Sequence, residues 1–324
     1  MREARWIALV LVMSGCGLGI TDSPSGGADN LPTSGAGPYG KPELDFDTPA
    51  DEPFVVEDAG GNLYDPAVLH RDGGGFRFWM GRQPDNVFDQ SEIWRAEIPA
   101  VTELPDVPPT PAMLPDQSWE VGRVAAPAVI EDGGRLVMYY EGGAPDAPSI
   151  GRAESADGGV TWQKEAGNPL LADAAEPTAV HIDGQWYLYV TRPGQVGIFR
   201  ATSADGLSFD LDPTPVIAPR PDLPEAFDPV AVSDPFVIAG RTEAGQLHWG
   251  IFFNGIDASG DAAIGYAGSF DGVAWERFGG ADPVLTDGSP AEYGPTAVLE
   301  PSRGFLFYQQ IGQQRQRIGV ALHP

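Results

Sequence analysis

Short apolar runs separated by polar turns fill most of the chain, and one apolar phrase built around a proline recurs five times. The copies are Tyr64–Leu69, Ala125–Ile130, Ala175–Val180, Ser233–Ile238 and Tyr293–Val298. Their prolines lie 61, 50, 58 and 60 residues apart along the sequence. Self-similarity at such a period is the signature of a repeat architecture.

Every copy is followed by a run of aromatic and β-branched residues bounded by Gly, Asp or Arg, which is typical of a β-strand. These runs are Phe76–Gly81, Arg135–Gly142, Gln185–Arg192, Leu247–Gly255 and Phe305–Gln310. A third apolar run follows in each repeat, and three repeats then carry a tight turn with Asp and Gly. Five copies of a strand-rich unit predict an all-β fold, a five-bladed β-propeller over residues 51–324.

The outer strands suggest how the ring closes. Three repeats end on a short apolar segment that suits an outer strand: Asn168–Leu171, Thr214–Ile217 and Asp282–Leu285. The fifth repeat has none, and Glu52–Val56 ahead of the first repeat has the same pattern. We expect this N-terminal strand to complete blade five and close the ring, which removes an open sheet edge. In blade one we expect Glu92–Glu97 as the third strand and Pro99–Pro115 as a loop.

Strand direction predicts a site at one end of the ring. The residues just before the five prolines are Asp65, Ala126, Glu176, Asp234 and Gly294. Because the second strand of each blade returns to the face where the first begins, its end lies beside these residues. The residues that we expect there are Arg82, Glu141, Arg192, Asn254 and Gln309, together with Tyr293. A concave mouth with converging polar groups is the usual form of a ligand site.

The charge of the chain excludes some partners. There are 19 Lys and Arg against 46 Asp and Glu, a formal net charge of −27, and no basic stripe. Nucleic acid is therefore excluded as a partner, and so is binding to an anionic membrane surface through charge. The acidity suits a soluble domain, which we expect to be a monomer, and a neutral partner such as a glycan tolerates it.

The N-terminal segment has the layout of a secretory signal. Arg2 and Arg5 precede the apolar stretch Trp6–Met13, which is too short to span a bilayer. The following Met13–Cys16 segment resembles a bacterial lipobox, which implies a signal peptide over residues 1–15 and a lipid on Cys16. Cys16 is the only cysteine, so no intrachain disulfide forms. An ordinary signal peptide with an incidental cysteine is the alternative.

Residues 16–50 are rich in Gly, Ser, Pro, Asp and Thr and have few large apolar side chains. Such a composition cannot form a core and predicts a flexible tether. The expected location is the cell envelope, with the lipid as the only membrane attachment, and we expect the outer membrane because Gly17 after the cysteine differs from an inner-membrane retention Asp.

The turns carry a family resemblance. Ser155–Trp162, Ser203–Phe209 and Ser269–Trp275 resemble the Ser-x-Asp-Gly turns of five-bladed glycosidases, the arabinanase, levansucrase and invertase superfamily that includes glycoside hydrolase family 43. The phrases at Tyr64–Leu69 and Ala125–Ile130 are similar to the openings of its first two blades. The resemblance covers the whole repeat region and implies a carbohydrate substrate and hydrolysis of glycosidic bonds.

In that superfamily a first-blade Asp acts as base or nucleophile, a second Asp tunes and orients, and a Glu donates a proton. The resemblance therefore implies a catalytic set of Asp65, Glu176 and Asp234, in which Asp65 activates water, Glu176 is the acid and Asp234 modulates it. We expect the mouth residues named above to bind substrate. Arg82 and Arg192 either bind a carboxylated sugar or neutralise the nearby acids.

Two departures from the superfamily pattern support an alternative function. Blade two has Ala128 where many members have Asp, and in blade four Ser233 occupies the usual place of the acid. A non-catalytic propeller that binds glycan or protein at the cell surface is therefore the alternative, and a purely structural envelope lipoprotein is a third. A carboxylate before proline also has a structural explanation, because that residue prefers an extended backbone.

No His pair or thiolate cluster has metal-ligand spacing, so the sequence predicts no zinc site. The function needs no cofactor, although Asp ligands on the axis suit a calcium ion.

Overall fold

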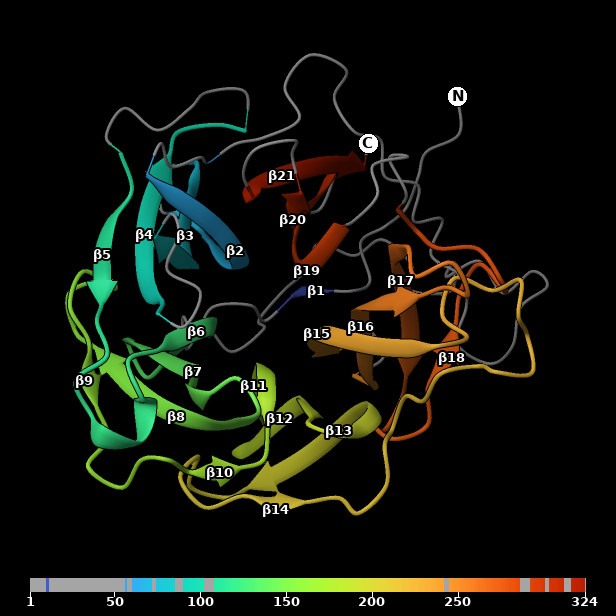
Figure 1. The fold of residues 1–324 in the computed structure, drawn as a ribbon, viewed down its shortest axis with the longest axis horizontal. Coiled ribbons are helices and arrows are strands. Elements are labelled where there is room, and N and C mark those ends of the chain that lie inside the picture. Colours follow the sequence, from blue (N-terminus) through green and yellow to red (C-terminus); the bar gives the residue numbers. More distant parts are fainter. Residues whose placement is uncertain are drawn as a thin grey trace.

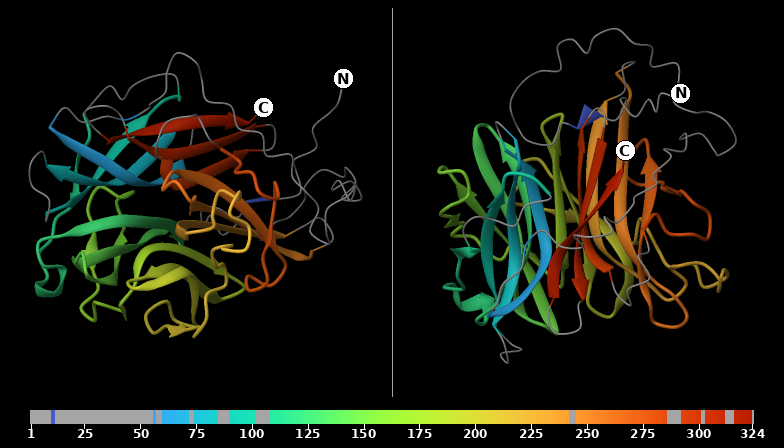
Figure 2. Two further views of the ribbon diagram at one scale, coloured as in Figure 1. Left: turned by 45° about the vertical axis from the view of Figure 1, so that its right-hand side comes forward. Right: turned by 90° about the horizontal axis from the view of Figure 1, so that it is seen from above.

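The computed structural model describes residues 10–11, 56, 60–71, 74–84, 90–101, 108–241, 245–285, 292–300, 303–311 and 316–323. Five antiparallel sheets surround a central axis, so the chain is a five-bladed β-propeller as predicted (Figure 1). Seen from the side, the strands cross the thickness of the ring (Figure 2). The predicted signal peptide other than residues 10–11, together with Cys16, the tether and residues 52–55, lies outside the described residues.

The blades follow one another in sequence order. Blade one contains β2 (Gly61–His70), β3 (Phe76–Pro84), β4 (Glu92–Ile98) and β5 (Thr110–Met113). Blade two contains β6 (Val124–Asp132), β7 (Arg135–Ala144), β8 (Ala147–Ser155), β9 (Gln163–Lys164) and β10 (Leu171–Ala172). Blade three contains β11 (Ala175–Ile182), β12 (Gln185–Arg192), β13 (Gln195–Ser203) and β14 (Asp210–Leu211). Blade four contains β15 (Ala231–Arg241), β16 (Leu247–Ile256), β17 (Ala262–Ser269) and β18 (Glu276–Arg277). Blade five contains β19 (Glu292–Glu300), β20 (Arg303–Ile311) and β21 (Gln316–His323).

Two short elements lie outside this pattern. The strand β1 (Val10–Leu11) pairs antiparallel with β15 at Gly240 and Arg241. The 3-10 helix η2 (Ser118–Glu120) precedes blade two. Among the described residues, no helix has the length and apolar character needed to cross a membrane.

The structure corrects the expected loop of blade one. Within the stretch Pro99–Pro115, Thr110–Met113 forms the outer strand β5 and pairs with β4. Proline is tolerated there because an outer strand leaves one row of backbone groups free of ladder bonds, and Pro111 lies in this strand.

The expected closing strand is described at one residue. Val56 forms an antiparallel bridge with Ile318 of β21, and each of the two backbone N–H groups donates to the other residue's carbonyl, at 3.4 and 3.0 Å. Val56 is fully buried. At this position the N-terminal segment therefore extends blade five as expected.

Each inner strand contains the same bulge. The register of the five first strands with their second strands shifts at the pre-proline residue, for example between Tyr64 and Ala67. The pre-proline residues have left-handed backbones, with φ of 47° at Asp65, 43° at Ala126, 53° at Glu176, 47° at Asp234 and 59° at Gly294. The expectation of an extended backbone before proline is therefore wrong, because a left-handed residue is what a β-bulge of this kind requires.

The Ser-x-Asp-Gly turns join neighbouring blades. In blade two the Ser155 hydroxyl donates to Asp157, and the same pairing recurs in the turns of blades three and four. Each turn then offers a Gly carbonyl to an aromatic side chain of the preceding blade. The three pairs are Trp79 Nε1 with Gly159 at 2.9 Å, Tyr139 hydroxyl with Gly206 at 2.8 Å, and Tyr189 hydroxyl with Gly272 at 2.9 Å.

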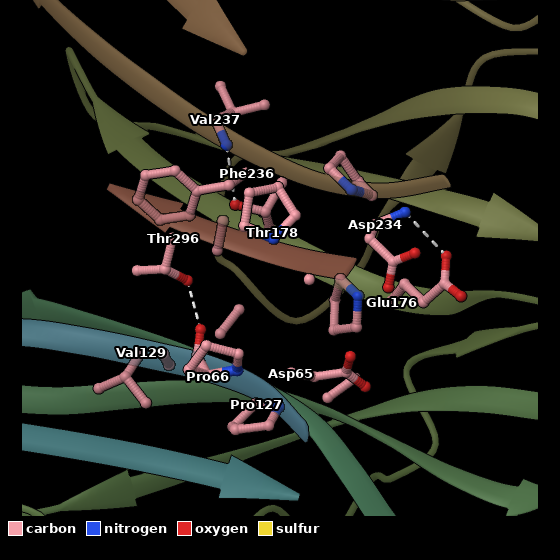
Figure 3. A pocket seen from close by; sticks show the side chains of 18 of the residues that line it. Asp65, Pro66, Pro127, Val129, Glu176, Thr178, Asp234, Phe236, Val237 and Thr296 are labelled. Carbon is pink, nitrogen blue, oxygen red and sulfur yellow. Dashed lines mark hydrogen bonds between the residues drawn. The ribbon is translucent and has the colours of Figure 1, made fainter. Parts of the chain in front are cut away.

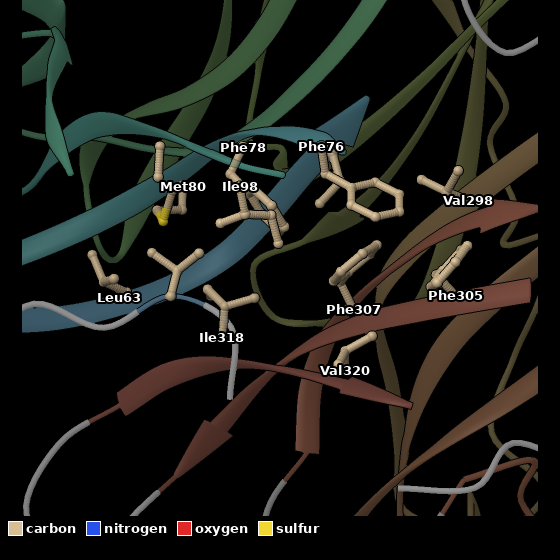
Figure 4. Packing of buried hydrophobic residues seen from close by; sticks show 13 residues of the cluster. Leu63, Phe76, Phe78, Met80, Ile98, Val298, Phe305, Phe307, Ile318 and Val320 are labelled. Carbon is tan, nitrogen blue, oxygen red and sulfur yellow. The ribbon is translucent and has the colours of Figure 1, made fainter. Parts of the chain in front are cut away.

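The core lies between the blades rather than inside one of them. Phe76 and Phe78 of blade one meet Phe305 and Phe307 of blade five edge to face, with ring centroids 5.0 to 5.1 Å apart (Figure 4). Aromatic pairs of this geometry stabilise beyond the area that they bury. The first and last blades of the chain are thus held together by a buried aromatic cluster.

Candidate active site

A pocket follows the axis of the ring and is lined by the five inner strands. Its volume is about 50 Å³, enough for a few water molecules. The carboxyl groups of Asp65, Glu176 and Asp234 gather at one end, and Thr178 and Thr296 lie further along (Figure 3). We name this carboxylate end the mouth.

Strand register places the ends of the second strands beside the mouth, although in blade three the paired residue is Thr191 and not the expected Arg192. Arg82 pairs with Leu63, two residues before Asp65, and Glu141 pairs with Ala125. Three further pairs complete the pattern around the ring: Thr191 with Ala175, Asn254 with Ser233, and Gln309 with Tyr293.

Carboxylates link successive blades through the backbone of the bulges. Glu141 Oε2 accepts the N–H of Glu176 at 3.0 Å, and Glu176 Oε2 accepts the N–H of Asp234 at 3.0 Å. Glu176 Oε2 also accepts the hydroxyl of Thr191 at 2.8 Å. Since the bulge takes these N–H groups out of the strand ladder, a neighbouring carboxylate satisfies them. Two of the acids therefore connect blade two to blade three and blade three to blade four.

Hydroxyl and amide groups surround the carboxylate of blade four. Asp234 Oδ2 accepts the Ser233 hydroxyl at 2.6 Å and the Asn254 side-chain amide at 3.1 Å. Asn254 is fully buried. Tyr293 is half-buried, and its pKa is raised by burial and then by the charges of Asp234 and Asp261.

One blade on either side separates Asp65 from the other two acids. The blades on either side of it carry Ala126 and Gly294 at the equivalent positions. A Cβ added to Gly294 would lie 2.9 Å from Asp65 Oδ1, closer than real Cβ contacts come. The glycine of blade five therefore leaves the space that the Asp65 carboxylate occupies.

The three central carboxyls hold protons more strongly than usual. Burial, and after it the charges of Glu176 and Glu141, raise the pKa of Asp65 to about 8. Burial and the charge of Asp234 raise the pKa of Glu176 to about 8. Burial and the charge of Asp65 raise the pKa of Asp234 to about 7. Although each residue keeps some accessible surface at the mouth, protein encloses its carboxyl group, so near neutral pH the set retains protons.

Two functional candidates escaped the sequence analysis. Arg123 forms an ion pair with Glu141, with 2.5 Å between Nη2 and Oε1. It is held there because it bridges to Ser91 of the preceding blade and lies directly before β6. The other candidate is Thr191, the hydrogen-bond partner of Glu176. Thr191 could have been found from the alternation of side chains along β12. Arg123 has no counterpart in the other repeats, so the repeat pattern could not reveal it.

The two arginines expected at the mouth each contact a backbone carbonyl and an aromatic ring. Arg82 donates to the Gly60 carbonyl at 2.9 Å and lies over the Trp94 ring at 4.5 Å. Arg192 donates to the Asp173 carbonyl at 3.3 Å and lies over the Phe199 ring. Within the described residues, no group of three or more His, Cys, Asp and Glu side chains is arranged to hold a metal ion.

Comparison with known proteins gives a likeness of fold alone. No protein-family profile and no curated protein sequence matches the chain. Among solved structures, "Catalytic domain of Coprinopsis cinerea GH62 alpha-L-arabinofuranosidase" matches with a TM-score of 0.64 and 9% identity over 86% of this chain and 96% of its own. "Crystal structure of GH62 hydrolase in complex with xylotriose" matches with a TM-score of 0.65 and 11% identity over 86% of this chain and 97% of its own.

A third structure concerns "the GH130 family of mannoside phosphorylases", described as containing "glycoside hydrolases that target beta-1,2 mannosidic linkages in Candida mannan". It matches with a TM-score of 0.64 and 16% identity over 86% of this chain and 93% of its own. The chain thus shares the five-bladed propeller fold of these structures, as the resemblance of the turns implied.

Proposed function

We propose that the chain is a glycoside hydrolase whose active site is the mouth. The observation that carries the proposal is the arrangement of the acids. Asp65 lies in a sector of its own, and Glu176 and Asp234 lie together in neighbouring blades, joined by a hydrogen bond. Hydrolysis of a glycosidic bond needs one protonated and one ionised carboxyl on either side of it.

The contacts of the three carboxyl groups indicate which catalytic role each one takes. The Glu176 carboxylate accepts the Thr191 hydroxyl and the Asp234 N–H, both at Oε2. We therefore assign to Oε1 the proton that passes to the leaving group. Asp65 acts as the base that activates water, and Asp234, held by Ser233 and Asn254, modulates Glu176. Clustered acids whose pKa values are raised suit this division, because one member stays protonated near neutral pH.

The substrate is a glycan, bound at the mouth by Arg82, Glu141, Arg192, Asn254, Gln309 and Tyr293. The solved structures named above concern different glycans, so their titles support the class and leave the sugar open. We propose further that the chain is a secreted monomer held in the cell envelope, at the outer membrane, by a lipid on Cys16, which would give it access to extracellular glycans.

The test is hydrolysis by the full-length protein in detergent against aryl furanosides, aryl pyranosides, and plant and microbial polysaccharides. The panel is run with and without inorganic phosphate, so that phosphorolysis is seen if it occurs. Asp65→Asn and Glu176→Gln should each lower kcat at least about a hundredfold. Asp212→Asn, an acid paired with Arg200 in blade three, is the control. Turnover that survives both substitutions would overturn the proposal.

One observation favours the alternative of a binding propeller. Glu141 and Glu176 already serve as acceptors for bulge N–H groups, so a structural need explains their presence without catalysis. Blade two also carries Ala126 and Ala128 in the ring. Retained binding to one glycan of the panel with no turnover by the unsubstituted protein would identify this function.

A further inference from the structure

The ion pair between Arg123 and Glu141 lies beside the carboxylates of the mouth, because Glu141 also accepts the backbone N–H of Glu176. Glu141 is almost fully buried, and the exposed fraction of the Arg123 side chain is 19%. The pair is anchored from both sides. The backbone of Arg123 bridges to Ser91 of blade one, and Glu141 accepts the N–H of Glu176 in blade three. One arginine therefore connects three successive blades at the mouth.

The charge of the guanidinium also acts on the blade-one acid. Arg123 lowers the pKa of Asp65, against the larger effects of burial, Glu176 and Glu141. It acts in the same direction on the neighbouring phenol of Tyr64, whose pKa burial raises. The charged and titratable groups around Asp65 are thus Arg123, Glu141, Glu176, Asp234 and Tyr64, and Arg123 is the one cation among these five.

We propose that Arg123 is a positioning residue of this site, which holds Glu141 beside the blade-three bulge and offsets the negative charge that faces Asp65. The catalytic consequence of this role rests on the proposed function. With the cation in place, Asp65 gives up its proton at a lower pH than it would among acids alone, and so becomes available as the base. Burial and the charge of Asp234 raise the pKa of Glu176 to about 8, so Glu176 keeps the proton that the leaving group requires.

Removal of the two charges, one at a time, should shift the acid limb of the kcat/KM profile in opposite directions. A purely structural role predicts no such pair of shifts. In Arg123→Met the acid limb of the kcat/KM profile should move to higher pH by about one unit, because an opposite charge near Asp65 is lost. In Glu141→Gln the limb should move to lower pH, since a like charge is lost while the amide oxygen still accepts the Glu176 N–H. In the double variant the limb should return close to its original position.

Two further variants separate charge from folding. Arg123→Lys keeps the cation without the planar fork, and should recover most of the shift in the limb even if the protein is less stable. Arg200→Met removes an arginine of similar exposure, 18%, from its ion pair with Asp212, and should leave the limb in place. If Arg123→Met lowers activity with no change in the limb, Arg123 is structural and the proposal is wrong.

A second readout works without catalysis. Titration of the side-chain carboxyls by carbon NMR, with the Asp65 signal assigned from its loss in Asp65→Asn, should show the same pattern of shifts. Absence of turnover in the unsubstituted protein, together with these NMR shifts, would refute the proposed function and leave the role of Arg123 standing. Asp65 titration that is identical with and without Arg123 would refute the role itself.

Discussion

At the left-handed positions that open the blades, the side chain determines how much backbone strain a residue carries. An L-residue with a Cβ is disfavoured there by roughly 1–2 kcal/mol, whereas glycine adopts this backbone freely. Asp and Asn are tolerated better than most residues. Four of the five positions nevertheless carry a side chain, and three of these side chains are carboxylates that converge at the mouth. Strain that persists in this way is concentrated at functional sites.

The equivalent positions in blades two and five provide a matched pair. Ala126→Gly should raise the free energy of unfolding by about 0.5–1 kcal/mol, because relief of strain at φ 43° exceeds the entropy that glycine adds to the unfolded chain. Gly294→Ala should lower it by about 2 kcal/mol, because φ is 59° and the new Cβ would press on Asp65. Urea unfolding measures both, and equal signs would contradict the account.

The raised pKa of Asp65 makes stability depend on pH. Below about pH 4, the usual pKa of Asp, the carboxyl is protonated in both states and its contribution to stability is fully present. As the pH rises toward about 8, the unfolded chain loses this proton and the folded protein keeps it, so stability falls. Asp65→Asn should reduce the fall in unfolding free energy between about pH 5 and 8 by on the order of 1 kcal/mol, discounted for solvent access. An unchanged pH slope would show that Asp65 ionises normally.

At the scale of the elements, each blade is fastened to the next by a turn and an aromatic side chain. Trp79, Tyr139 and Tyr189 carry the donors that reach the turns of blades two, three and four. The residues in register at the same place in blades four and five are Phe252 and Phe307, which have no donor. This agrees with the sequence, in which blades five and one lack the Ser-x-Asp-Gly turn. The aromatic residue in each blade therefore matches what the next blade offers.

This match predicts reciprocal effects. Tyr189→Phe should lower the free energy of unfolding by about 1–2 kcal/mol, because it leaves the buried carbonyl of Gly272 without its donor. Phe252→Tyr should also destabilise, by about 1–3 kcal/mol, since it buries a hydroxyl where blade five has no such turn. Thermal unfolding of the two variants beside Tyr187→Phe, on the same strand as Tyr189, is the measurement. A neutral Tyr189→Phe would show that the turn is held by other contacts.

The repeat made most of these elements predictable from the sequence. Its apolar phrases and aromatic runs became the first and second strands of every blade, because alternation and strand length agree with a pleated sheet. The strand β5 was not predicted, because Pro111 locally indicates a loop. The pairing of β5 with β4, which makes it a strand, depends on residues distant in the sequence. The carboxylates were found because they repeat. Arg123 was missed because it occurs once, and its partner Glu141 is adjacent only in the fold.

At the scale of the whole molecule, the ring is stable only if its two ends meet. The aromatic cluster of Phe76, Phe78, Phe305 and Phe307 joins blades one and five, and the N-terminal segment is bonded to blade five at Val56. The lining of the mouth comes from all five blades. Separation of the first and last blades would therefore move Asp65 away from Glu176 and Asp234, so that closure of the ring and assembly of the site are one event.

Closure can be tested at Val56, which is fully buried against the edge of blade five. Val56→Asp should lower the free energy of unfolding by about 3 kcal/mol or more, because it buries an unpaired charge and weakens the bridge to Ile318. Val160→Asp, at a valine that is 46% exposed in the turn of blade two, should change it by no more than about 0.5 kcal/mol. Denaturant unfolding gives both values. If ring closure organises the mouth, Val56→Asp should also impair glycan binding or turnover under conditions where most of the protein is still folded. Full activity in a destabilised Val56→Asp would show that the carboxylates stay assembled when the closing contact is weakened.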